Sequence, residues 1–390
     1  MKVLFVENAG NKSAGAFHSL IGLILQLRKY NVESYVAVSD KADGLDLLEA
    51  NSIPYIALRA CAYTWVISNN ASLVEKTKMP LKYLYVYLHR KELIKYARDN
   101  NIDVIHENTS ACYIGKYVAD SLEIPHIWHI REFLEEDFGV KVWCHKNFIN
   151  KLNSSTALIA ISNAVADKYS QLTSAKIYTI YNGIAVDAFY SDSHKINLCS
   201  QSKLLCVGRI CQGKGQKEVI QAVAEIYQNN NIKLNVTFAG IYNQDYVEEL
   251  LDIARNAGIS DCVHFIGQCN EMSNLYKKHD ILCMASHKEA FGRVTIEAML
   301  AGELVIGANS GGTAEIITNG ENGYLYDVGD YQDLAKIILY SIENKEEAYE
   351  VAKRGQRMAI SEYDAATNAK KIYELYSALL TESADRRQNE

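Results

Sequence analysis

Two glutamates, Glu289 and Glu297, lie with seven residues between them around a Phe291-Gly292 pair. An apolar run at residues 280–286 precedes them, and helix-forming residues follow. A strand, a glycine loop and a helix N-terminus form an anion site, because the first N–H groups of a helix have no partner inside it. Carboxylates beside an anion need a neutral partner, and sugar hydroxyls fit that need. The alternative is two surface glutamates at an accidental spacing, and the spacing alone leaves both interpretations open.

A second candidate segment, CVGRICQGKGQ, places Arg209 and Lys214 after another apolar run. Arginine offers a bidentate fork and lysine a point charge, and both neutralise phosphate oxygens. The alternative is a turn with incidental charges. A third loop carries Gly311-Gly312 ahead of a further helix. Loops that follow parallel strands meet at the same edge of a sheet, so we expect these three to line one crevice.

The elements that must position these loops alternate along the whole chain. Short β-branched runs separated by helical stretches predict parallel sheets flanked by helices, first over residues 1–182 and again over residues 183–364. We expect a helix near residues 365–381 to pack back onto the first half. A chain of 390 residues is too long for one hydrophobic core, so we predict two domains. Both are expected to be Rossmann-like, and the fold class is α/β.

The chemistry-bearing segments VGRICQGKG, EAFGRVTIEAMLAG and SGGTAEIITNGENGYLYDVGD occur in that order over about 120 residues. Together they resemble the retaining glycosyltransferases of family 4. The resemblance implies the GT-B fold, in which two Rossmann-like domains present parallel sheets across a cleft. It also implies that Arg209 and Lys214 bind the diphosphate of a nucleotide sugar, that Glu297 holds the ribose hydroxyls and that Glu289 holds the donor sugar.

The same resemblance implies further site residues. The segment around Phe291, Gly292, Arg293, Val294 and Thr295 would support the sugar and the phosphates. In the first half, WHIREF resembles the family segment whose histidine reaches the donor sugar, so His129 joins Glu289, Arg209 and Lys214 as a predicted catalytic residue. Arg131 and Glu132 are candidates for acceptor or phosphate contacts. Gly15, in the loop NAGNKSAGA, is a candidate donor contact, and Asn182-Gly183 resembles a structural interdomain turn.

Neither a metal nor an organic cofactor is expected. No two aspartates stand two residues apart, so the Asp-x-Asp motif of metal-dependent glycosyltransferases is absent. Arg209, Lys214 and helix N-termini would supply the positive charge instead. The sequence also lacks a G-x-S-x-G hydrolase elbow and, in its first loop, the G-x-G-x-x-G nicotinamide fingerprint. A net charge of −7 argues against a nucleic-acid partner.

Residues 76–98 form a basic, tyrosine-rich segment with seven Lys or Arg and one Glu. Such a face could rest on anionic lipid headgroups. The alternative is a solvated helix face with ordinary core aromatics. Under either interpretation, the helix predicted over residues 73–98 is broken at Pro80.

Nine scattered cysteines without a CxxC pair are typical of reduced buried thiols. We therefore expect a cytoplasmic protein, at the inner face of the membrane if residues 76–98 bind lipid.

The resemblance implies hexosyl transfer with retention from a nucleoside-diphosphate sugar, UDP rather than GDP, to a hydroxyl of a glycan or a lipid-linked acceptor. Such a reaction serves the synthesis of cell-surface polysaccharide or glycoconjugate. One alternative is a sugar-nucleotide epimerase or hydrolase on the same fold. Another is a non-catalytic partner subunit of a glycosyltransferase, and the presence of Arg209, Lys214, Glu289 and Glu297 argues against it.

Overall fold

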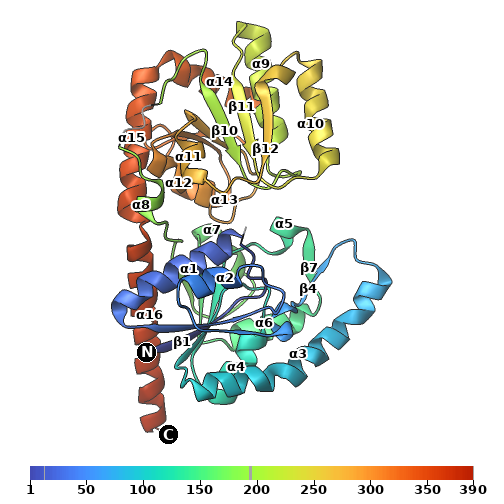
Figure 1. The fold of residues 1–390 in the computed structure, drawn as a ribbon, viewed down its shortest axis with the longest axis vertical. Coiled ribbons are helices and arrows are strands. Elements are labelled where there is room, and N and C mark those ends of the chain that lie inside the picture. The colour runs from blue at the N-terminus through green and yellow to red at the C-terminus, as the bar shows by residue number, and fades with distance from the viewer. Residues whose placement is uncertain (13, 193–195, 390) are drawn as a thin grey trace. The chain divides into compact units, whose positions relative to one another are not determined.

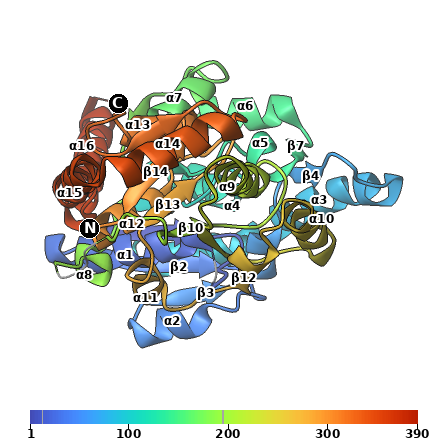
Figure 2. The same cartoon turned by 90° about the horizontal axis from the view of Figure 1, so that it is seen from above.

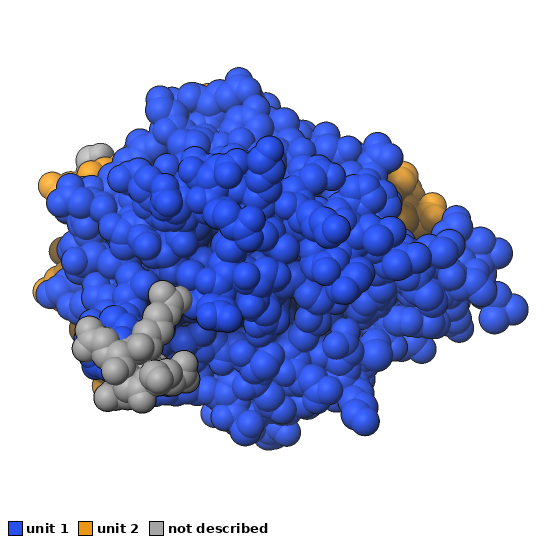
Figure 3. All heavy atoms as spheres, turned by 90° about the horizontal axis from the view of Figure 1, so that it is seen from below, with its two compact units in different colours: residues 1–183, 365–390 blue, residues 184–364 orange. Residues whose placement is uncertain are grey.

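The computed structural model describes residues 1–12, 14–192 and 196–389. The chain divides into two compact units. Unit 1 contains residues 1–183 and 365–390, and unit 2 contains residues 184–364 (Figure 3).

Unit 1 is built on a seven-stranded parallel sheet in the order β3-β2-β1-β5-β6-β8-β9. Its strands are β1 Lys2–Val6, β2 Glu33–Val38, β3 Tyr55–Ala57, β5 Val104–Glu107, β6 His126–Ile130, β8 Ala157–Ala160 and β9 Ile177–Thr179. Each coincides with a β-branched run predicted from the sequence. A small antiparallel pair, β4 Val66–Ser68 with β7 Val140–Val142, was not predicted. The chain order reverses between β1 and β5, which makes their carboxyl ends the switch point of this sheet.

Helices cover the sheet of unit 1 on both faces (Figure 1). They are α1 Gly15–Leu27, α2 Leu45–Ala50, α3 Leu73–Asp99, α4 Ile114–Leu122, α5 Glu135–Phe138, α6 His145–Asn153, α7 Asn163–Ser170 and α16 Ala365–Asn389. The last of these packs along α1, where Ile372, Tyr376 and Leu379 share one core with Phe17 and Leu20. The final helix is therefore part of unit 1, although it follows unit 2 in the sequence.

Helix α3 runs without interruption from Leu73 to Asp99, so the predicted break at Pro80 is wrong. Its start is fixed by a capping box between Ser72 and Glu75. Proline removes one N–H and leaves the carbonyl of Lys76 without its helical donor. Pro80 is exposed, so water can bond that carbonyl, and the packing of Met79 and Val86 holds the helix on either side.

Unit 2 has a six-stranded parallel sheet in the order β12-β11-β10-β13-β14-β15. Its strands are β10 Lys203–Val207, β11 Asn235–Ala239, β12 Val263–Gly267, β13 Ile281–Met284, β14 Leu304–Ala308 and β15 Tyr324–Tyr326. All six were predicted from apolar runs. The order is that of a Rossmann sheet, and its switch point lies between β10 and β13. The two-sheet α/β fold class predicted from the sequence is confirmed.

The helices of unit 2 form a layer on each face of this sheet. Helices α9, α10 and α14 pack together, and α11, α12 and α15 form the other group (Figure 2). Their bounds are α8 Val186–Phe189, α9 Gln216–Asn230, α10 Gln244–Asn256, α11 Met272–Tyr276, α12 Arg293–Ala301, α13 Gly311–Ile316, α14 Tyr331–Glu343 and α15 Lys345–Glu362. Within the described ranges, no helix of either unit is both long and apolar enough to cross a bilayer.

Candidate functional site

Three loops meet at the switch point of unit 2, and hydrogen bonds join them. The Lys214 ammonium lies 2.8 Å from Glu289 Oε2, which links the loop after β10 to the loop after β13. The N–H of Gly312 donates to the carbonyl of Glu289 over 2.7 Å and ties in the loop after β14. The N–H of His287 also donates to the carbonyl of Gly213 over 2.9 Å. Lys214 and Glu289, seventy-five residues apart, are therefore direct neighbours.

Glycines make this close approach of backbones feasible. A Cβ atom on Gly215 would lie 2.0 Å from the carbonyl oxygen of Ala285, and one on Gly312 would lie 2.5 Å from the Cα of Phe291. Neither position can hold a side chain without moving the backbone it contacts. The glycine spacing therefore serves the packing of the three loops as well as any ligand.

Gly292 caps helix α12 with a φ of 93°, a conformation that other residues rarely adopt. The hydroxyls of Thr295 and Thr313 face this glycine, at 3.3 and 3.6 Å from where its Cβ would be. Both hydroxyls are buried and have no hydrogen-bond partner among the described residues. Phe291 is buried behind them against the ring of Tyr363. Two unused hydroxyls thus lie at the N-terminus of α12, where the helix dipole favours an anion.

Glu297 is buried within α12 and held by two donors. Its Oε1 accepts from Arg293 Nε over 2.6 Å, and its Oε2 accepts from the Tyr276 hydroxyl over 2.9 Å. Burial and the Glu297 charge raise the pKa of Tyr276 well above its usual value, so the phenol stays protonated and donates. A carboxylate has about four acceptor positions, so Glu297 retains capacity for hydroxyl donors. Tyr276 was not predicted as a site residue, because the segment around it carries no recognisable motif.

The remaining predicted residues of unit 2 differ in their surroundings. Arg209 is exposed, and its guanidinium makes no hydrogen bond or ion pair with the described part of the chain. Its carbonyl accepts from Gln216 Nε2 over 3.0 Å, which fixes the backbone of the loop. Val294 is half-buried in the first turn of α12. The structure thus brings Lys214 and Glu289 into contact and leaves the Arg209 side chain free to turn toward a ligand.

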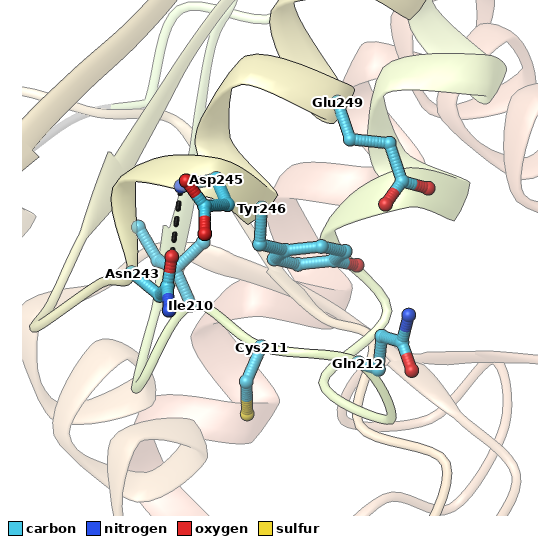
Figure 4. A pocket seen from close by; sticks show the side chains of 7 residues that line it. All are labelled: Ile210, Cys211, Gln212, Asn243, Asp245, Tyr246 and Glu249. Carbon is cyan, nitrogen blue, oxygen red and sulfur yellow. Dashed lines mark hydrogen bonds between the residues drawn. The ribbon is translucent and has the colours of Figure 1, made fainter.

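A pocket of about 470 Å³ lies beside the Arg209 loop, at the carboxyl ends of β10 and β11 (Figure 4). Asn243, the N-cap residue of α10, accepts from the N–H of Asp245 over 2.8 Å. The pocket is lined by Ile210, Cys211, Gln212, Asn243, Asp245, Tyr246 and Glu249. None of the predicted site residues lines it.

In unit 1, the predicted His129 is the penultimate residue of strand β6 and lies in a buried polar cluster at the switch point. Arg131 donates from Nε to Asn108 over 2.9 Å, from Nη1 to Asn182 over 2.5 Å and from Nη2 to His129 Nδ1 over 3.2 Å. Glu7, at the end of β1, accepts from the Asn108 amide over 2.6 Å. The side chain of Asn182, predicted to belong to a structural turn, is therefore one of the groups that orient Arg131.

Other unit 1 candidates are placed less directly. Glu132 accepts hydrogen bonds from Thr109 and Ser110 over 2.7 to 2.8 Å and so anchors the loop after β5. Burial raises the pKa of its carboxyl. Gly15 is the first residue of α1, and the loop before it includes residue 13, which lies outside the described residues. The cluster members Glu7 and Asn108 were missed, although polar residues that end apolar strands could have indicated them.

Two family profiles match successive parts of the chain. Residues 20–188 match the profile described as Glycosyltransferase Family 4, and residues 192–358 match the profile described as Glycosyl transferases group 1. The chain belongs to family 4 of the glycosyltransferases. The resemblance predicted from the three glycine-rich segments is confirmed, and the second profile spans every predicted site residue of unit 2 in this glycosyltransferase.

Curated relatives match parts of this glycosyltransferase. The N-acetyl-alpha-D-glucosaminyl L-malate synthase of Bacillus anthracis is 27% identical over 203 residues, which cover 50% of this chain and 52% of that protein. The capsular polysaccharide biosynthesis glycosyltransferase CapM of Staphylococcus aureus is 26% identical over 246 residues, or 59% of this chain and 63% of CapM. Each match spans less than two-thirds of the relative's length.

A solved structure matches the glycosyltransferase over nearly its whole length. HepE of Anabaena, crystallised in complex with UDP and glucose, has a TM-score of 0.79 and 25% sequence identity. The match covers 97% of this chain and 100% of HepE. A second HepE structure contains UDP-glucose.

Proposed function

We propose that this glycosyltransferase transfers a hexosyl group from a UDP-sugar to a hydroxyl of a glycan or a lipid-linked acceptor, with retention at the anomeric carbon. The observation that carries the proposal is the contact of Lys214 with Glu289 at the meeting point of three glycine loops. A cation for phosphate, carboxylates for sugar hydroxyls and free helix N–H groups are the groups that a nucleotide sugar needs. The UDP and UDP-glucose bound by HepE favour UDP over GDP.

In this reaction the bond from C1 of the sugar to the diphosphate breaks, and a bond from C1 to the acceptor oxygen forms. Negative charge develops on the leaving diphosphate. Lys214, Arg209 and the N-terminus of α12 stabilise that charge. Glu297 accepts the ribose hydroxyls and Glu289 the hydroxyls of the sugar. The acceptor proton passes to the leaving phosphate on the same face of the sugar, so no general base of the protein is required.

An acceptor-dependence assay tests the proposed reaction. Purified protein is incubated with UDP-glucose or UDP-N-acetylglucosamine, with and without membrane or glycan acceptors, and both released UDP and the anomeric configuration of the product are measured. A transferase releases UDP mainly when an acceptor is present and keeps the anomeric configuration. Release without acceptor identifies the epimerase or hydrolase, whereas no release with any nucleotide sugar favours the non-catalytic partner subunit.

Metal removal is expected to leave this activity within about twofold of its starting value, because Lys214, Arg209 and helix N–H groups supply the charge at the diphosphate. The measurement is UDP release before and after exhaustive treatment with EDTA. Loss of activity that added Mg²⁺ or Mn²⁺ restores contradicts a metal-independent reaction.

We further propose that helix α3 places the protein on anionic membranes. Tyr83 packs inward and stacks on Tyr113 with ring centroids 5.2 Å apart, whereas Tyr87 is 48% exposed. The outer face instead exposes a row of apolar side chains among the basic ones: Leu73 79%, Val74 61%, Leu81 65%, Leu84 52% and Leu88 57%. Leucines that enter the headgroup region and lysines that meet anionic lipid are the two parts of an interfacial helix. A membrane position would bring the enzyme to lipid-linked acceptors.

Charge reversal at Lys82, Arg90 and Lys91 is expected to reduce co-flotation with phosphatidylserine vesicles by about tenfold or more, since each basic residue near the surface contributes about 1 kcal/mol. A matched reversal at the exposed Lys217, Lys277 and Lys345 of unit 2 should have no effect. If the wild type, the α3 variant and the unit 2 variant float equally, α3 is a solvated helix that does not bind the membrane. Glutamine at Leu81 and Leu84 tests the apolar part separately.

A further inference from the structure

A chain of buried hydrogen bonds connects the C-terminal helix to His129. The hydroxyl of Tyr376, on α16, lies 2.6 Å from His106 Nδ1. His106 Nε2 lies 3.1 Å from His129 Nδ1, and Arg131 Nη2 approaches the same nitrogen at 3.2 Å. All of these groups belong to unit 1, and the three side chains beyond Arg131 are at most 1% exposed.

The direction of each bond follows from the chemistry of arginine. A guanidinium only donates, so His129 Nδ1 is an acceptor and carries no proton. Burial and the nearby Arg131 charge lower the pKa of both His129 and His106, which keeps the two imidazoles neutral. A neutral imidazole has one N–H, and in His129 it is therefore on Nε2. His106 must then donate a hydrogen bond from Nε2 to His129 Nδ1. At its own Nδ1, it accepts a hydrogen bond from the Tyr376 hydroxyl.

The far end of this chain is unused. His129 Nε2 is buried and has no hydrogen-bond partner among the described residues. A buried N–H without an acceptor is unfavourable and rare in folded proteins, so its persistence at a strand end beside an arginine points to a ligand oxygen. Three side chains are thus arranged to present one N–H that the protein itself does not use.

We propose that Tyr376 and His106, together with Arg131, hold His129 in the Nε2–H tautomer so that this N–H donates to a substrate oxygen. Tyr376 and His106 are positioning residues, because they reach the substrate only through His129. The inference rests on the proposed function for the identity of the oxygen. It assigns to α16 a role in the chemistry in addition to its packing on α1.

The tautomer can be read in the ligand-free protein by long-range ¹⁵N NMR of labelled histidine, which distinguishes protonated from unprotonated ring nitrogens. We expect His129 protonated at Nε2 and His106 also protonated at Nε2. In Tyr376→Phe, His106 should become a mixture of tautomers. The turnover number for UDP-sugar should fall about fivefold, the worth of one hydrogen bond, while KM for the donor stays within about twofold. Tyr373→Phe, on the same helix, is the matched control and should change neither.

Variants at His106 separate positioning from folding. His106→Gln places an amide N–H near the position of Nε2, so this variant should keep most of the activity. The shorter His106→Asn side chain reaches only the position of Nδ1, so this variant should lose most of the activity. Protonation of His129 at Nδ1, or a Tyr376→Phe protein with unchanged spectra and turnover, overturns the inference. If the spectra behave as expected but no nucleotide sugar is turned over by the wild type, the proposed function fails while the assignment of the tautomers stands.

Discussion

Replacing Lys214 by alanine should lower UDP-sugar turnover by about 100- to 1000-fold, the usual effect of removing one preorganised group that stabilises developing charge. The lysine ammonium lies 2.8 Å from Glu289, at the place where three loops converge. Among the described residues, Lys214 is the cation that pairs with Glu289. In the proposed reaction, its replacement removes a point charge from beside the leaving diphosphate. The measurement is the steady-state rate of UDP release at saturating donor.

The matched control is Lys217→Ala, which removes the same charge from an exposed position on α9 and should stay within about twofold of the wild type. Glu289→Ala should also lose most activity, because the donor sugar then lacks its carboxylate. The two losses should not add in the double variant, since the residues are in contact and act on one ligand. Unchanged rates in both single variants would refute the site assignment.

The second large effect is on stability and concerns Glu303, between α12 and β14. Its side chain is fully buried, and neither carboxylate oxygen has a hydrogen-bond partner in the described ranges. Burial, reinforced by the charge of Asp280, raises its pKa well above the usual value. The folded state therefore keeps a proton that the unfolded chain releases above pH 4.5, and stability falls as the pH rises through that interval. The slope is about 1.4 kcal/mol per pH unit.

Glu303→Gln should remove this slope, so its advantage over the wild type should be absent near pH 4 and grow toward pH 8. Glu303→Met should be more stable still at pH 8, because it also removes the buried polar atoms. Urea unfolding at several pH values measures both effects, with the exposed Glu321→Gln as the charge-matched control. A wild type and a Glu303→Gln variant with parallel stability curves between pH 5 and pH 8 would contradict a buried, protonated Glu303.

The sheets and the glycine loops could be predicted from the sequence because both depend on local patterns. Apolar β-branched runs indicate buried parallel strands, and the loops that follow them must meet at one sheet edge. The local pattern failed at Pro80, where tertiary packing keeps the helix continuous. It also failed for the short antiparallel pair β4 and β7, whose strands have three residues each and lie over seventy positions apart.

The partners of the site residues could not be predicted, because they come from distant parts of the chain without a motif. Tyr376 meets His106 across 270 positions, and Tyr276 meets Glu297 through the packing of α11 on α12. Nothing in the composition of either helix marks the tyrosine as a partner. The sequence motifs identify the groups that would touch a ligand, whereas the groups that orient them become visible only in the fold.

The central claim is that unit 2 holds a uridine nucleotide against Lys214, and thermal denaturation with nucleoside diphosphates tests it most directly. At a concentration of 100 times Kd, a ligand that binds only the folded state adds about 2.7 kcal/mol to the free energy of unfolding. We expect UDP and UDP-sugars to raise the Tm of the wild type and of Lys217→Ala, GDP to have a smaller effect, and Lys214→Ala to lose most of the shift. A wild type whose Tm no nucleotide or nucleotide sugar changes, or a Lys214→Ala variant stabilised as fully as the wild type, would contradict the account.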